Sequence, residues 1–268
     1  MDQGGWVSQA QGGFPSWKAR GASSEKVVYG KGVMIVSGVE GSSFLDYPGM
    51  LSCVLFTQGC NYDCFYCHNR SLIAHQNGSI GYQEIESFLK KRVGFLQAVV
   101  ISGGEPTLHG ELAQYFLLAK DLGFFTKLDT NGSRPKVLLE LLEAGLLDYV
   151  ALDVKAPWAR YREIAGKGAD PKNVQRCVSL LQEYQGTHPA FRWEVRTTLA
   201  PTLGEADLFE IATMLPEVNR WVLTFYRTPK DYRQKDEERI NLPALGEREV
   251  VGLQERLLLL QPNLKRVR

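Results

Sequence analysis

The chain has 268 residues, 44% of them hydrophobic, and its 31 Lys and Arg nearly balance 30 Asp and Glu, giving a net charge of +1. The interleaved charges include no basic run that would favour nucleic acid, and no stretch reaches the roughly 18 apolar residues of a membrane span. The N-terminus lacks a secretory apolar core and three of the five cysteines are clustered, so we expect a cytoplasmic protein whose thiols hold metal.

The predicted elements follow one another as alternating strands and helices. Residues 1–28 lack periodicity and are predicted to be a loose extension. We expect strands at 51–57, 97–102, 124–129, 149–154, 191–199 and 220–225, and helices at 82–91, 112–122, 135–143, 173–184, 206–215 and 247–260. Thr202 to Glu205 has the spacing of a capping box ahead of one helix.

Repeated strand–helix units predict an α/β fold with a parallel sheet covered by helices. About six units, fewer than the eight of a closed barrel, predict a partial (βα)6 TIM-like barrel. We assign residues 29–230 to this core domain and 231–268 to a C-terminal helical segment packed on it.

Polar residues follow five consecutive predicted strands. The first strand leads into a cysteine-rich loop, and the later ones end at Ser102–Pro106, Asp129–Gly132, Asp153–Lys155 and Arg196–Thr198. Because reactive groups in such sheets lie where strands end, one rim should carry the site.

The cysteine loop contains Cys60, Cys64 and Cys67 with the spacing C-x3-C-x2-C. Three thiolates are one fewer than a closed 4Fe–4S cluster uses, which leaves one iron open for a substrate or cofactor. A Cys3His zinc site with His68 is an alternative, although adjacent Cys67 and His68 would wrap one tetrahedral ion with difficulty. Covalent haem at C-x-x-C-H and a thioredoxin-like C-x-x-C are two others, and both leave Cys60 unexplained.

This loop, followed at the next strand end by Gly-Gly-Glu, resembles the radical S-adenosylmethionine (radical SAM) superfamily. The resemblance implies a cluster held by Cys60, Cys64 and Cys67, whose open iron binds SAM and whose electron releases a 5′-deoxyadenosyl radical. It also implies that Tyr66 lies near the adenine, that Glu105 meets the SAM ammonium and that Lys155 meets its carboxylate or ribose edge. The full set of expected cofactor contacts is Tyr66, Cys67, His68, Gly103, Gly104, Glu105, Asp129, Asp153, Lys155 and Arg196.

Seven segments between residues 35 and 225 resemble, in their order and amino-acid sequence, the activating proteins of anaerobic ribonucleoside-triphosphate reductase. These segments are 43–49, 58–61, 67–69, 100–108, 127–132, 148–157 and 195–198. The implied function is abstraction of a hydrogen from one backbone glycine of that partner, with a flavodoxin or ferredoxin as electron donor. In this branch Asp129, Thr130 and Asp153 would border a monovalent cation, and the turn at 46–49 is a candidate partner contact.

Three other functions remain open from the sequence. They are activation of another glycyl radical enzyme such as pyruvate formate-lyase, small-molecule chemistry of the 7-carboxy-7-deazaguanine synthase type, and a non-catalytic iron–sulfur or zinc module. Pyruvate formate-lyase activators carry a late histidine near SAM, whereas the corresponding segment here, 225–229, has none.

Overall fold

The computed structural model describes residues 34, 36–73 and 80–267, which form one eight-stranded sheet in the linear order β1 to β8. Its strands are β1 (Val36–Ser43), β2 (Ser52–Thr57), β3 (Ala98–Gly103), β4 (Phe125–Thr130), β5 (Tyr149–Asp153), β6 (Arg192–Leu199), β7 (Trp221–Phe225) and β8 (Leu264–Val267). β1 pairs antiparallel with β2, and every later pair is parallel. The six parallel strands β2 to β7 confirm the predicted partial barrel.

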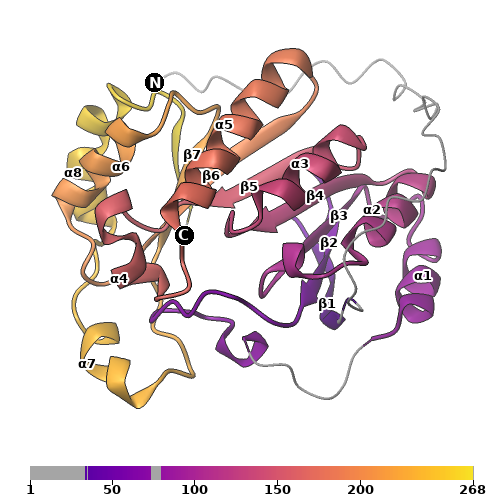
Figure 1. Ribbon diagram of the computed structural model, residues 1–268, viewed down its shortest axis with the longest axis horizontal. Coiled ribbons are helices and arrows are strands. Elements are labelled where there is room, and N and C mark those ends of the chain that lie inside the picture. The colour runs from indigo at the N-terminus through magenta and orange to yellow at the C-terminus, as the bar shows by residue number, and fades with distance from the viewer. Residues whose placement is uncertain (1–33, 35, 74–79, 268) are drawn as a thin grey trace.

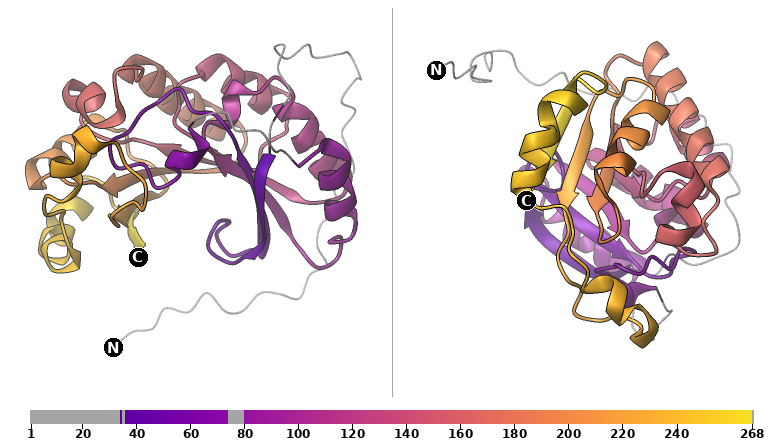
Figure 2. Two further views of the ribbon diagram at one scale, coloured as in Figure 1. Left: turned by 90° about the horizontal axis from the view of Figure 1, so that it is seen from below. Right: turned by 90° about the vertical axis from the view of Figure 1, so that its left-hand side faces the viewer.

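Helices connect the parallel strands and cover the outside of the curved sheet, as Figures 1 and 2 show. They are α1 (Tyr82–Lys90), α2 (Leu112–Asp121), α3 (Pro135–Glu143), α4 (Tyr161–Ala165), α5 (Pro171–Thr187), α6 (Glu205–Met214), α7 (Glu237–Ile240) and α8 (Glu247–Leu258), with short 3-10 turns at Arg70–Leu72, Pro106–Leu108, Trp158–Arg160 and Gln234–Asp236. Within the described ranges, no helix is both long and apolar enough to cross a membrane.

Alternation along the strands divides the side chains between the two faces of the sheet. Leu55, Ile101 and Leu152 belong to the large core beneath the helices. Val54 and Val100, on the other face, pack with Tyr47 and Tyr149 in a smaller cluster inside the barrel.

The turn between β1 and β2 lies at the end of the barrel where β2 begins, whereas the cysteine loop follows the other end of β2. Tyr47 of this turn is buried, and its ring centroid lies 5.5 Å from that of Tyr149 at the start of β5. The turn that the sequence suggested for partner contact therefore closes the end of the barrel opposite the cysteine loop.

Two expectations differ from the structure. The segment 231–268, expected to be helical, also contributes β8, which extends the sheet beside β7 while α8 packs on α6. The capping box is shifted: Gly204 is the N-cap of α6, and its N–H donates to Asp207 Oδ2 at 2.8 Å, whereas Thr202 has φ 78 and precedes the helix. The predicted extension 1–28 lies outside the described residues.

Candidate active site

The last residue of α4 and the segment that follows it support the cysteine loop. Asp63 N–H donates to Ala165 O at 3.2 Å, and Cys64 Sγ lies 3.7 Å from the same carbonyl oxygen. A Cβ at Gly166 would lie 3.0 Å from Asp63 O, and one at Gly168 would lie 2.5 Å from Asn61 O. Both glycines allow two backbones to approach closely, a role that the sequence alone did not reveal.

The Gly-Gly-Glu turn at the end of β3 lies directly against the start of the cysteine loop. Gly104 N–H donates to Thr57 O at 2.9 Å, and Glu105 N–H donates to Gly59 O at 2.8 Å. A Cβ at Gly104 would lie 2.1 Å from Gly59 O, and Gly103 has φ +113. We expected these glycines to admit a ligand; in the structure they first admit the backbone that leads to Cys60.

Glu105 is completely buried, and its carboxylate joins the ends of β3 and β4. Oε1 accepts from Thr107 N–H at 3.1 Å, Thr107 Oγ1 at 2.5 Å and Thr130 Oγ1 at 2.7 Å, while Oε2 accepts from Asn131 N–H at 2.7 Å. Burial raises the pKa of Glu105, although these four donors oppose the shift. Oε2 has one donor, which leaves it further acceptor capacity.

A chain of ion pairs crosses the inside of the barrel beside these strand ends. Asp129 pairs with Lys127 at 2.7 Å and with Arg196 at 3.1 Å, and Arg196 Nε lies 3.4 Å from Asp153. Asp153 also pairs with Lys155 at 3.0 Å. Burial alone would raise the pKa of Asp129, but Arg196, Lys127 and the hydrogen bonds outweigh it, so the net pKa is lowered.

Lys155 is the last member of this chain of ion pairs. Burial would lower its pKa, but the carboxylate of Asp153 raises it well above the usual value, so Lys155 is a cation. Burial raises the pKa of Cys60 to about 12 and that of Cys64 to about 11, and the charge of Lys155 lowers the pKa of each of the three loop thiols. The charge of Lys155 therefore opposes part of the effect of burial on all three thiols.

The two expected aromatic contacts differ in exposure. Tyr66 is buried against Phe65, with ring centroids 5.3 Å apart, whereas His68 is exposed with its ring 6.4 Å from that of Tyr226. The buried hydroxyls of Tyr66 and Tyr62 have no hydrogen-bond partner within the described residues.

The C-terminal segment reaches the loop from the other side, which no sequence motif indicated. Arg233 forms an ion pair with Asp63, and the guanidinium carbon of Arg239 lies 4.0 Å from the centre of the Phe65 ring. Asp63 also pairs with Arg70 at 2.5 Å. Such contacts between distant segments carry no local sequence signal.

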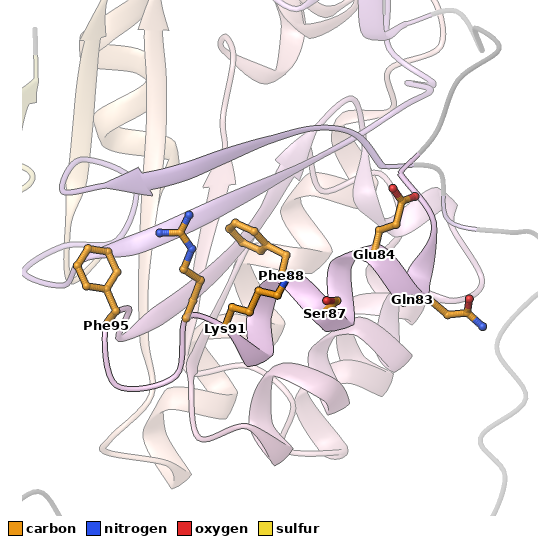
Figure 3. A pocket seen from close by; sticks show the side chains of 7 residues that line it. Gln83, Glu84, Ser87, Phe88, Lys91 and Phe95 are labelled. Atoms are coloured by element: carbon orange, nitrogen blue, oxygen red, sulfur yellow. The ribbon is translucent and has the colours of Figure 1, made fainter.

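A hollow on the surface lies elsewhere, along the outer face of α1 (Figure 3). It is lined by Gln83, Glu84, Ser87, Phe88, Lys91, Arg92 and Phe95, and it contains none of the residues that the sequence assigned to the site.

The residues at the rim fit a three-cysteine cluster and SAM. No three His, Cys, Asp or Glu side chains in the described part of the chain are grouped around a point that would suit a single metal ion, but a cubane takes one thiolate at each of three irons. Metal binding requires thiolates, and the charge of Lys155 partly opposes the rise in pKa that burial causes at the three thiols. The donor set therefore suits the cluster chemically.

Comparison with known proteins identifies the family. The family model described as the radical SAM superfamily matches residues 54–215. A protein of Methanocaldococcus jannaschii, provisionally named a glycyl-radical enzyme activating enzyme, is 34% identical over 81% of this chain and 90% of its own. The pyruvate formate-lyase-activating enzyme of Streptococcus mutans is 30% identical over 79% of this chain and 84% of its own.

Among solved structures, Streptococcus suis SuiB bound to S-adenosylmethionine superposes with a TM-score of 0.62 at 16% identity. The match covers 80% of this chain but about half, 49%, of the longer SuiB chain, so this likeness concerns the fold. Taken with the sequence matches, the chain belongs to the radical SAM superfamily and, within it, to the glycyl-radical-enzyme activating enzymes, a family that uses a 4Fe–4S cluster and SAM.

Proposed function

We propose that this enzyme binds its cluster through Cys60, Cys64 and Cys67 and activates an anaerobic ribonucleotide reductase by removing a hydrogen from one of its backbone glycines. A cluster held by these three cysteines would supply the electron that cleaves SAM into methionine and the adenosyl radical needed for hydrogen abstraction. The observation that carries the proposal is the meeting of the cysteine loop with the strand ends, where Glu105 N–H donates to Gly59 O at 2.8 Å and Lys155 pairs with Asp153 at 3.0 Å.

The chain's own residues would divide the binding of SAM between them. The ion-paired chain holds three cations, Lys127, Arg196 and Lys155, against two carboxylates, Asp129 and Asp153, so one positive charge is available for the SAM carboxylate. Lys155 and Arg196 are the partly exposed cations, with side chains 15% and 26% exposed.

The remaining contacts complete the proposed binding site. Glu105 Oε2 and the carbonyl groups of the Gly103–Gly104 turn would receive the ammonium group, and Tyr66 would lie near the adenine. His68, exposed at the edge of the loop, would contact SAM from the solvent side.

The same charges bear on the monovalent cation expected near Asp129, Thr130 and Asp153. Arg196 already bridges the two carboxylates, and Thr130 Oγ1 donates to Glu105. An additional cation would have to displace Arg196, so we propose that activity here does not depend on one. Rates of 5′-deoxyadenosine formation should agree within about twofold in sodium, potassium and tetramethylammonium buffers; a loss of tenfold or more in tetramethylammonium would contradict this.

The partner choice rests on the resemblance of the flanking segments to reductase activators, and the similarity to a pyruvate formate-lyase-activating enzyme makes that lyase the second candidate. The electron donor would be a flavodoxin or a ferredoxin.

The test is anaerobic reconstitution with iron, sulfide, SAM and a strong reductant. We expect 5′-deoxyadenosine from the wild type and from the matched control Cys53→Ala, whose cysteine lies buried in β2, and none from Cys64→Ala. The active protein is then mixed separately with an anaerobic reductase and with pyruvate formate-lyase. A glycyl radical doublet in electron paramagnetic resonance with the reductase supports the proposal, a doublet with the lyase alone refutes the partner, and no 5′-deoxyadenosine refutes the reaction.

A further inference from the structure

Asn131 belongs to the strand-end motif Asp129–Gly132 and has no role in the binding scheme above. It is the residue after Thr130 at the end of β4, and it is 5% exposed. Its backbone N–H donates to Glu105 Oε2, so its position is fixed by the buried carboxylate.

The side-chain amide of Asn131 is oriented by its own hydrogen bonds. Oδ1 accepts from Ser133 N–H at 2.9 Å, which places the NH2 group on the opposite side. The nitrogen Nδ2 then donates to Asn61 Oδ1 at 3.1 Å and to Cys60 Sγ at 3.8 Å. Because the carbonyl oxygen already has a donor, the reverse orientation of the amide would place two N–H donors face to face.

Cys60 therefore has a side-chain donor at its sulfur in addition to a backbone one, since Tyr62 N–H donates to the same Sγ at 3.4 Å. The sulfur of Cys64, in contrast, lies against a carbonyl oxygen, Ala165 O. When the thiols become thiolates, an N–H donor stabilises the negative charge on sulfur and a carbonyl oxygen does not.

Hydrogen bonds to the sulfurs of an iron–sulfur cluster are among the factors that set its reduction potential. Reduction adds negative charge to the cluster and its ligands, so a donor at a ligand sulfur favours the reduced state. We propose that Asn131 is a positioning residue that raises the reduction potential of the cluster through its hydrogen bond to Cys60. The inference rests on the proposed cluster site, but not on the identity of the partner enzyme.

The test is the midpoint potential of the reconstituted cluster, measured by anaerobic redox titration with electron paramagnetic resonance and without SAM or partner. Asn131→Leu keeps the shape of the side chain but removes its N–H donors. We expect a more negative midpoint than in the wild type, with an equal content of iron and sulfide per chain. The slower formation of 5′-deoxyadenosine that follows is a secondary readout.

Two matched controls separate the effect on sulfur from loosening of the loop. Asn61→Ala removes the other acceptor of the Asn131 amide, and Ser133→Ala removes a hydroxyl that donates to Asn61 Oδ1 at 3.2 Å; neither change touches the contact with Cys60. Both should retain the wild-type midpoint. An unchanged midpoint in Asn131→Leu, or the same shift in Asn61→Ala, would overturn the proposal.

A second measurement applies to the wild type, in case Asn131→Leu does not assemble a cluster. An exchangeable side-chain N–H near the cluster should give a hyperfine coupling between its deuteron and the electron spin of the cluster after exchange into D2O. Selective 15N labelling of asparagine should add a hyperfine coupling to nitrogen. Absence of the asparagine coupling in a loaded wild-type protein would also overturn the proposal. Failure of the wild type itself to assemble a cluster would refute the proposed function as well, whereas a loaded cluster with no activase activity would refute that function alone.

Discussion

The close contact between Gly104 and Gly59 makes a quantitative prediction for Gly104→Ala. The new Cβ would lie 2.1 Å from Gly59 O and 2.8 Å from Gly59 C, where ordinary contacts begin at 3.4 Å, so the two segments must separate by about 1.3 Å. Overpacking of this kind costs about 1–3 kcal/mol. The hydrogen bonds from Gly104 N–H and Glu105 N–H to the cysteine loop would weaken as well, at about 1 kcal/mol each.

We therefore expect Gly104→Ala to lower the free energy of unfolding by about 3–5 kcal/mol, against the stability of about 5–15 kcal/mol that is typical of a domain. Urea unfolding of the apoprotein, followed by circular dichroism, measures this loss. Because Gly59 precedes Cys60, the iron content after reconstitution should also fall to less than half that of the wild type.

The matched control is Gly186→Ala, an exposed position in α5 where a Cβ would meet nothing within 4 Å. This change should stabilise the protein by up to about 1 kcal/mol, since alanine favours a helix more than glycine does. If Gly104→Ala had the same urea midpoint of unfolding as the wild type and bound a full complement of iron, close packing would not explain the glycine at position 104.

Three further changes test the charges around the cysteine loop. Lys155→Met should weaken SAM binding at least tenfold in equilibrium dialysis, while Lys136→Met, at a position 90% exposed, should leave it unchanged. The pKa of Asp129 is lowered in the folded state, so its stabilising contribution is complete above the unfolded pKa of about 4 and is lost as the pH falls through the folded pKa. In Asp129→Asn, the free energy of unfolding measured by urea titration should therefore fall less steeply below about pH 5 than it does in the wild type. Arg233→Ala removes the ion pair with Asp63, and limited proteolysis should cut the C-terminal segment several times faster, with no change if that pair holds nothing in place.

Strand positions were predictable because buried parallel strands are short apolar runs. The predicted strand 97–102 differs from the observed β3 by one residue at each end, and the helix at Pro135–Glu143 was predicted with its observed bounds. Thr202 shows where local reading fails: the spacing suits a capping box, but the backbone there has a positive φ, and the first turn of α6 is capped by Asp207 instead. The folded structure therefore uses Gly204 and Asp207, and not Thr202 and Glu205, to cap this helix.

The supports of the cysteine loop could not be predicted in the same way. Gly166 touches Asp63 across about a hundred residues of sequence, and Arg233 reaches the same residue from the C-terminal segment. Neither residue belongs to a periodic pattern, and a glycine or an arginine in a loop has many possible uses. Their roles depend on distances that exist after folding.

The strand-end motifs also support the cysteine loop, which changes how variants of these residues should be interpreted. Glu105 was expected to meet the ammonium group of SAM, yet two of its four hydrogen bonds hold Thr130 and Asn131, and Asn131 in turn donates to the sulfur of Cys60. The proposed carboxylate contact for SAM and the support for the first cysteine are thus parts of one hydrogen-bonded unit. Loss of activity in a Glu105 variant would not separate these two roles, but the midpoint potential of the cluster and the affinity for SAM, measured independently, would, because the first depends on Asn131 and the second on Oε2. The Gly-Gly-Glu motif is therefore best understood as part of the scaffold of the cluster loop as well as a proposed binding surface for SAM.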